Sequence, residues 1–90
     1  MADILIADDH KFIRDMVRIT LSTQGWSIDE SDTAKGTIEQ VRSTRPRVLL
    51  LDVTFEGGDL TGFDVCRELK TSTATRDLPV IMLTALDSNE

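Results

Sequence analysis

Residues 48–52 read Val48-Leu49-Leu50-Leu51-Asp52, four apolar residues in a row directly before an aspartate. Two similar short apolar runs occur at residues 4–7 and 80–83. Uninterrupted apolar runs of this length are typical of strands that are covered on both faces of a parallel sheet. We therefore predict three buried strands in these places. Residues 27–31 form a weaker candidate, with Ile28 as the one large apolar residue, and this pattern favours a strand at the edge of the sheet.

Helical patterns separate the predicted strands. Residues 11–24 are predicted to form a helix that Gly25 ends. Residues 33–43 form a weaker pattern, and Thr61-Gly62-Phe63-Asp64 matches a capping box that opens a third helix. The first helix is expected to direct five residues inward: Ile13, Met16, Val17, Thr20 and Leu21. The resulting order, βαβαβαβ, predicts an α/β fold with a doubly wound parallel sheet and right-handed crossovers.

Length and charge narrow the classes of function. The chain has 90 residues, enough for one domain, and 10 Lys and Arg against 16 Asp and Glu give a net charge of −6. An acidic surface is repelled by phosphate backbones, so we expect no direct binding of nucleic acid. No apolar run is long enough to span a membrane, and the first residues lack the pattern of a secretory signal. The single cysteine, Cys66, fits a reducing compartment, so we expect a cytoplasmic protein.

Polar residues follow three of the predicted strands at the point where each strand ends. Asp8 and Asp9 follow the first strand, Asp52 follows the third, and Thr84 follows the fourth. In open α/β sheets the carboxyl ends of the strands form the usual binding site. Carboxylates held close together raise one another's pKa or require a cation, and Mg²⁺ prefers such oxygen ligands. Taken alone, Asp8 and Asp9 could be helix caps and Asp52 a turn residue, but the three together with Thr84 indicate a magnesium site.

The same residues suggest a chemistry. A carboxylate beside Mg²⁺ can accept a phosphoryl group, because the metal neutralises charge during the transfer. Competing schemes are less favoured: His10, the single histidine, is expected to be solvated or to lie next to the site, and Cys66 is expected in the core. No glycine-rich dinucleotide or P-loop motif follows the first strand.

The chain resembles the response-regulator receiver domains of two-component signalling, of the CheY-like type. Four segments carry the resemblance, and together they extend along the whole chain: Ile4-Leu5-Ile6-Ala7-Asp8-Asp9, Val48-Leu49-Leu50-Leu51-Asp52-Val53, Gly62-Phe63-Asp64-Val65-Cys66-Arg67-Glu68-Leu69-Lys70 and Leu78-Pro79-Val80-Ile81-Met82-Leu83-Thr84-Ala85. The resemblance implies a flavodoxin-like sheet with the strand order 2-1-3-4. It also implies that Asp52 is the phosphoacceptor and that a histidine kinase or a phosphotransfer protein is the donor.

The resemblance assigns further roles. Asp9 would bind Mg²⁺ directly and Asp8 through water, with Asp52 and the backbone carbonyl of Thr54 as further ligands. Thr84 would be the switch hydroxyl that turns toward the phosphoryl group. The backbone N–H groups of Thr54 and Ala85 would contact phosphoryl oxygens.

Two features depart from the family pattern. After Asp52, Phe55 and Glu56 stand where Met-Pro is usual, and Gly62 comes two residues late. Glu56 is expected to be a solvated loop residue. Receiver domains also continue through a fourth helix, a fifth strand and a fifth helix, so residues 1–90 read as a truncated receiver domain, and no lysine of this chain takes the family's phosphoryl-contacting role.

Truncation would leave the fourth strand as an open apolar edge and one flank of the first helix uncovered. We therefore expect a homodimer or a domain-swapped assembly. Two other functions remain open. One is an interaction module of the same fold that is not phosphorylated. The other is a phosphohydrolase with an aspartate nucleophile, which is disfavoured because Thr54 occupies the place of its acid/base aspartate.

Overall fold

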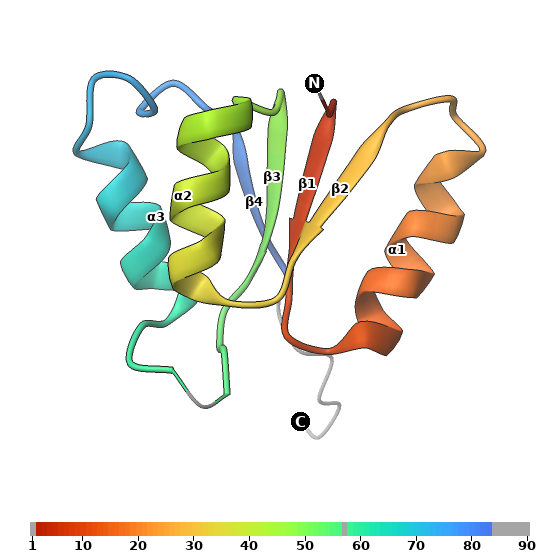
Figure 1. Cartoon of the computed structure of the whole chain (residues 1–90), viewed down its shortest axis with the longest axis horizontal. Coiled ribbons are helices and arrows are strands. Elements are labelled where there is room, and N and C mark those ends of the chain that lie inside the picture. The colour runs from red at the N-terminus through yellow and green to blue at the C-terminus, as the bar shows by residue number, and fades with distance from the viewer. Residues whose placement is uncertain (1, 57, 84–90) are drawn as a thin grey trace.

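The computed structural model describes residues 2–56 and 58–83, and it forms a four-stranded parallel sheet with helices on both faces (Figure 1). The strands lie in the order β2-β1-β3-β4, which confirms the predicted fold and places β2 at an edge. The elements follow one another as β1 (Ile4–Ala7), α1 (Lys11–Ser22), β2 (Ile28–Ser31), α2 (Ala34–Thr44), β3 (Val48–Asp52), α3 (Gly62–Lys70) and β4 (Val80–Leu83).

The two faces of the sheet are covered unequally. Alternate residues of a strand point to opposite faces, so each buried strand contributes to two apolar clusters. Leu5, Leu49 and Leu51 point toward α2 and α3, which bring Val41, Val65 and Leu69 into the larger cluster. The smaller cluster, on the side of α1, contains Ile4, Ile6 and Ile28, with Val17, Leu21 and Leu50 packed against it. In Figure 1, α1 stands on one side of the sheet and α2 and α3 stand together on the other.

The prediction for the inward side of α1 is partly wrong. Val17 and Leu21 pack against the smaller cluster, but Met16 and Thr20 are exposed, and no residue of α1 is fully buried. The helix contacts mainly β1 and β2. Its inward stripe is therefore narrower than the apolar pattern predicts. Cys66, by contrast, packs partly buried against the larger cluster, as expected of a core residue.

The loop of residues 53–61 is tied at both ends. Thr61 and Asp64 form the predicted capping box: the Thr61 hydroxyl accepts from the Asp64 N–H at 3.2 Å, and the Asp64 carboxylate accepts from the Thr61 N–H at 2.8 Å. These bonds lower the pKa of Asp64, with the Thr61 backbone as the main cause. The Gly62 N–H donates to the Val53 carbonyl at 2.7 Å, which closes the loop directly behind the end of β3.

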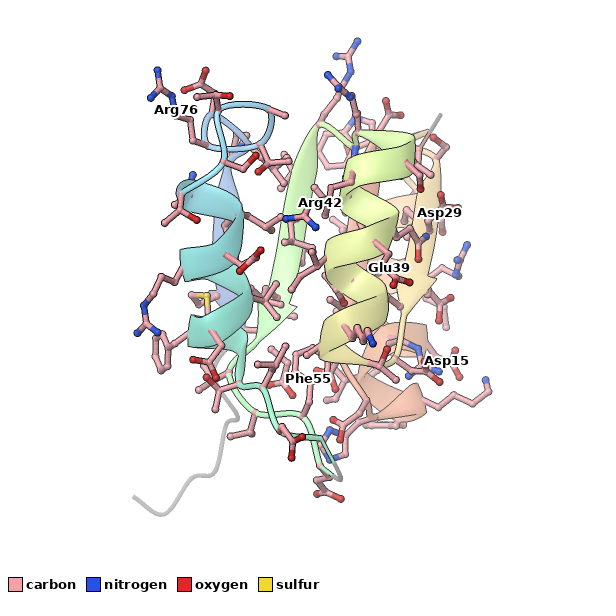
Figure 2. The ribbon with its side chains drawn as sticks, turned by 60° about the vertical axis from the view of Figure 1, so that its left-hand side comes forward. Asp15, Asp29, Glu39, Arg42, Phe55 and Arg76 are labelled. Atoms are coloured by element: carbon pink, nitrogen blue, oxygen red, sulfur yellow. The ribbon has the colours of Figure 1, made fainter. Side chains whose placement is uncertain are left out.

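Phe55 anchors the middle of this loop. Its ring is buried and belongs to the larger cluster, and Figure 2 shows it close to the ends of α2 and α3. Phe55 is thus a core residue, and its local sequence did not indicate this. The backbone on either side of it is fixed as a result, including the part that follows Asp52.

Gly62 should be intolerant of any side chain. A Cβ at this position would overlap the backbone carbonyl of Asp52, whereas a Cβ at Gly58 would meet nothing. We expect Gly62→Ala to lower the free energy of unfolding by about 1–3 kcal/mol, since backbone has to move. Gly58→Ala is the matched control and should change it by less than about 1 kcal/mol. Urea denaturation followed by circular dichroism measures both, and equal effects would contradict the proposed contact.

Candidate functional site

Three aspartates from two adjacent strands meet at the carboxyl end of the sheet. Strands β1 and β3 are paired in parallel, with Ala7 opposite Leu51, so the residues that follow them leave the sheet side by side. Asp8, Asp9 and Asp52 each offer a carboxylate oxygen, and His10 offers a ring nitrogen. These four atoms lie within 4.8 Å of one another. The structure thus brings together every aspartate that the sequence singled out.

The acidic pair is held in place by its neighbours. Asp8 is 3% exposed, and its Oδ1 accepts from the backbone N–H of His10 at 2.8 Å. The Arg14 guanidinium donates to the backbone carbonyl of Asp8 at 2.8 Å. Asp9 uses Oδ2 to accept from the backbone N–H of Glu56 at 2.7 Å. The turn after β1 and the loop after β3 are therefore joined through Asp9.

Asp52 is a buried carboxylate that forms no ion pair with a lysine or arginine among residues 2–56 and 58–83. It is 5% exposed, and its pKa is raised, chiefly by burial and next by the negative charge of Asp8. Hydrogen bonds from the backbone of Val53 and Thr54 act in the opposite direction. A buried carboxylate beside two others is unfavourable unless a cation or a proton joins them.

Two oxygens of this cluster have no hydrogen-bond partner among the described residues. They are Asp9 Oδ1 and Asp52 Oδ2, and both are fully shielded from solvent. Buried polar atoms normally have hydrogen bonds, so two carboxylate oxygens without one in the same place mark a position that a cation could occupy. Oxygen atoms from several carboxylates fit Mg²⁺ in both charge and chemistry.

The other predicted site residues are Thr54, Thr84 and Ala85, together with the loop residue Glu56. Thr54 is exposed and follows Asp52 closely, and the direction of its carbonyl group toward the cluster stays a prediction. Thr84 and Ala85 lie outside the described residues. Glu56 has an exposed side chain, in agreement with the sequence, but its backbone N–H binds Asp9.

His10 lies beside the acidic pair with a half-exposed ring, as the sequence predicts. Its Nδ1 lies 3.0 Å from both Asp8 Oδ1 and Asp9 Oδ1, and its Nε2 lies 3.6 Å from Glu56 Oε2. The hydrogen bond to Asp8 is the main cause of a raised pKa of His10, followed by the charge of Asp9.

The sequence model of the protein family described as the response regulator receiver domain matches residues 4–90. The chain belongs to the response regulator receiver domain family. Two similar curated proteins are response regulators called MprA. The one from Mycobacterium avium is 36% identical over 85 residues, and the one from Mycobacterium leprae is 38% identical over 85 residues. In both cases the match covers 94% of this chain and 36% of the relative, so the receiver domain spans about a third of those proteins.

Solved receiver domains have the same fold. The N-terminal domain of a response regulator receiver protein from Methanoculleus marisnigri superposes with a TM-score of 0.86 and 33% identity. That match covers 94% of this chain and 68% of the other. The receiver domain of NtrX from Brucella abortus gives a TM-score of 0.81 and 32% identity, over 89% of this chain and 65% of the other. None of the helices described in this chain has the length and apolar character needed to cross a membrane.

Removing the charge of Asp52 should stabilise the metal-free protein at neutral pH. Because burial raises the folded-state pKa of Asp52, the native state binds this proton more tightly than the unfolded chain does. The associated stability is present at low pH and is lost as the pH rises through the folded-state pKa. We therefore expect Asp52→Asn to raise the free energy of unfolding at pH 7, with a gain that shrinks as the pH falls. Urea titrations in a chelator at several pH values measure this, and a gain that grows in acid would contradict it.

Proposed function

We propose that Asp52 is the phosphoacceptor of this receiver domain and that a histidine kinase or a phosphotransfer protein is the donor. One observation carries the proposal: a buried carboxylate at the end of the central strand β3 has an unpaired oxygen beside two further carboxylates. This arrangement combines a nucleophile with a cation site. The family supports the same assignment, because receiver domains are signalling modules of response regulators.

In the proposed transfer, an Asp52 carboxylate oxygen attacks the phosphorus of a phosphohistidine. The new O–P bond forms as the N–P bond breaks, and the electron pair of that bond returns to the imidazole nitrogen of the donor. The product is an acyl phosphate on Asp52. The backbone N–H groups that already face Asp52, those of Val53 and Thr54, hold the carboxylate in place during the attack.

The acidic pair has a supporting role in this proposal. Asp9 would hold Mg²⁺ directly and Asp8 through water, with Asp52 and the Thr54 carbonyl as further ligands. When bound, Mg²⁺ neutralises charge on the carboxylates and on the transferred group. The backbone N–H of His10 holds the Asp8 carboxylate in position for this role. The backbone N–H of Glu56 does the same for the Asp9 carboxylate. Thr84 and Ala85 would contact the phosphoryl oxygens and pass the change on to partner proteins.

We further infer that this receiver domain acts in the cytoplasm. The single cysteine, Cys66, supports this, since an unpaired thiol persists in a reducing compartment. The chain spans 68% and 65% of the two solved receiver domains.

Phosphorylation of Asp52 can be tested with a small phosphodonor such as phosphoramidate. We expect Mg²⁺-dependent addition of one phosphoryl group, detected by intact-protein mass spectrometry, and its loss in Asp52→Asn. Asp59→Asn is the matched control, because Asp59 is an exposed carboxylate of the same loop. Labelling that survives in Asp52→Asn would contradict the proposal. A chain that binds Mg²⁺ and takes up no phosphoryl group would favour the interaction module.

The side of the sheet that carries α1 should pair with a second copy of the chain. Phe12 and Ile19 on α1 are 70% and 68% exposed, and Ile81 on β4 is 54% exposed. Strand β4 also forms an edge of the described sheet, so its backbone offers a further place for pairing. Together these features support a homodimer or an exchange of elements between two chains.

Light scattering tests the self-association. We expect a dimeric mass at micromolar concentration and a monomeric mass for Ile81→Lys, because a charge would be buried in the interface. Phe63→Lys is the control: Phe63 is 56% exposed but lies on α3, which covers the opposite face. A folded wild-type chain that is monomeric would contradict the proposed dimer.

A further inference from the structure

His10 presents a ring nitrogen to the same space as the three aspartates. Its Nδ1 lies 3.0 Å from one oxygen of Asp8 and 3.0 Å from one oxygen of Asp9. It also belongs to the set of four atoms within 4.8 Å of one another that includes an oxygen of Asp52. Ligands of one metal ion lie at comparable separations, since each stands about 2.0–2.2 Å from the ion.

A carboxylate lies near the second ring nitrogen of His10. The other ring nitrogen, Nε2, lies 3.6 Å from Glu56 Oε2. Histidines that bind metals usually donate their second N–H to a carboxylate or a carbonyl, which fixes the tautomer and the direction of the ring. The backbone of Glu56 is held by Asp9 at 2.7 Å, so an aspartate of the cluster also positions the loop that carries this carboxylate.

Two oxygen atoms of the cluster make no hydrogen bond within the described part of the chain and could bind an ion. Asp9 Oδ1 and Asp52 Oδ2 are buried, have no hydrogen-bond partner among the described residues and lie next to His10 Nδ1 in the same group. His10 itself is not needed as a helix cap: it occupies the N-cap position of α1, but its side chain makes no capping hydrogen bond. Its Nδ1 is hydrogen-bonded to Asp8 Oδ1 at 3.0 Å, so a bound ion would take the place of the proton that these two atoms share.

We infer that His10 is a metal ligand through Nδ1, oriented by Glu56, and that it gives this site a preference for transition-metal ions over Mg²⁺. The inference rests on the cation site of the proposed function and adds a nitrogen ligand to it. Imidazole suits Zn²⁺, Co²⁺ and Ni²⁺, whereas Mg²⁺ is bound by carboxylates, carbonyls and water. An oxygen-only cluster would show this preference more weakly. The neutral imidazole binds with its proton on Nε2, directed at Glu56.

Paired titrations of Co²⁺ and Mg²⁺ into the chain test the role of His10. His10→Phe keeps a planar ring and removes both nitrogens, and circular dichroism checks that it folds. We expect this variant to bind Co²⁺ about tenfold or more weakly in calorimetry, with Mg²⁺ affinity unchanged or higher. Glu56→Gln should weaken Co²⁺ binding to a smaller extent, and Asp59→Asn should leave both ions unaffected.

Nitrogen NMR supplies a readout that does not depend on affinity. His10 is the single histidine of the chain, so its ¹⁵N imidazole signals need no assignment among several residues. We expect Zn²⁺ to shift the Nδ1 signal and leave Nε2 protonated. Equal loss of Co²⁺ and Mg²⁺ affinity in His10→Phe, no loss of either, or an unchanged Nδ1 signal would overturn the inference. A wild-type chain that binds neither ion would overturn the proposed cation site, and the role of His10 with it.

Discussion

Repulsion among buried carboxylates is the constraint on which the site depends. Parallel pairing of β1 with β3 brings the Asp8–Asp9 pair beside Asp52, and burial keeps water from screening them. The raised pKa of Asp52 and the two unpaired oxygens are consequences of that placement. A fold that only had to be stable would avoid such a cluster. This one keeps it at the carboxyl end of the sheet, where the proposed cation and phosphoryl group would bind.

The loop between β3 and α3 makes this placement rigid. Phe55 is buried in the larger apolar cluster, Gly62 lies against the carbonyl of Asp52, and the Glu56 N–H binds Asp9. Each contact fixes a different part of the loop, and together they leave Asp52 little freedom. The loop departs in sequence from the usual family pattern, yet two of these three anchors contact aspartates of the acidic cluster, Asp9 and Asp52. Partner specificity and ion preference are the properties that such a loop could alter without displacing Asp52, the proposed phosphoacceptor.

Helix α1 is held differently from the helices on the other face. Its attachment relies on Glu30 of β2, which accepts from Arg14 at 2.8 Å and from Arg18 at 2.6 Å. These two hydrogen bonds, that of Arg14 first, lower the pKa of Glu30. Helices α2 and α3, in contrast, bury apolar side chains together, and Arg42 on α2 reaches Glu68 on α3 at 3.0 Å (Figure 2). The side of the sheet that carries α1 therefore depends more on charge pairing, and it keeps apolar side chains exposed.

The sequence by itself determined the strands, their order through the family resemblance, the capping box of Thr61 and Asp64, and the three aspartates. These features are local: an apolar run, a cap or a residue after a strand is read from neighbours along the chain. The tertiary structure alone decided that Phe55 is buried, that Met16 is exposed, and that His10 and Glu56 face each other beside the acidic cluster. Those outcomes depend on which elements pack together in space, because burial and ion pairing are set by distant segments that a linear pattern does not contain.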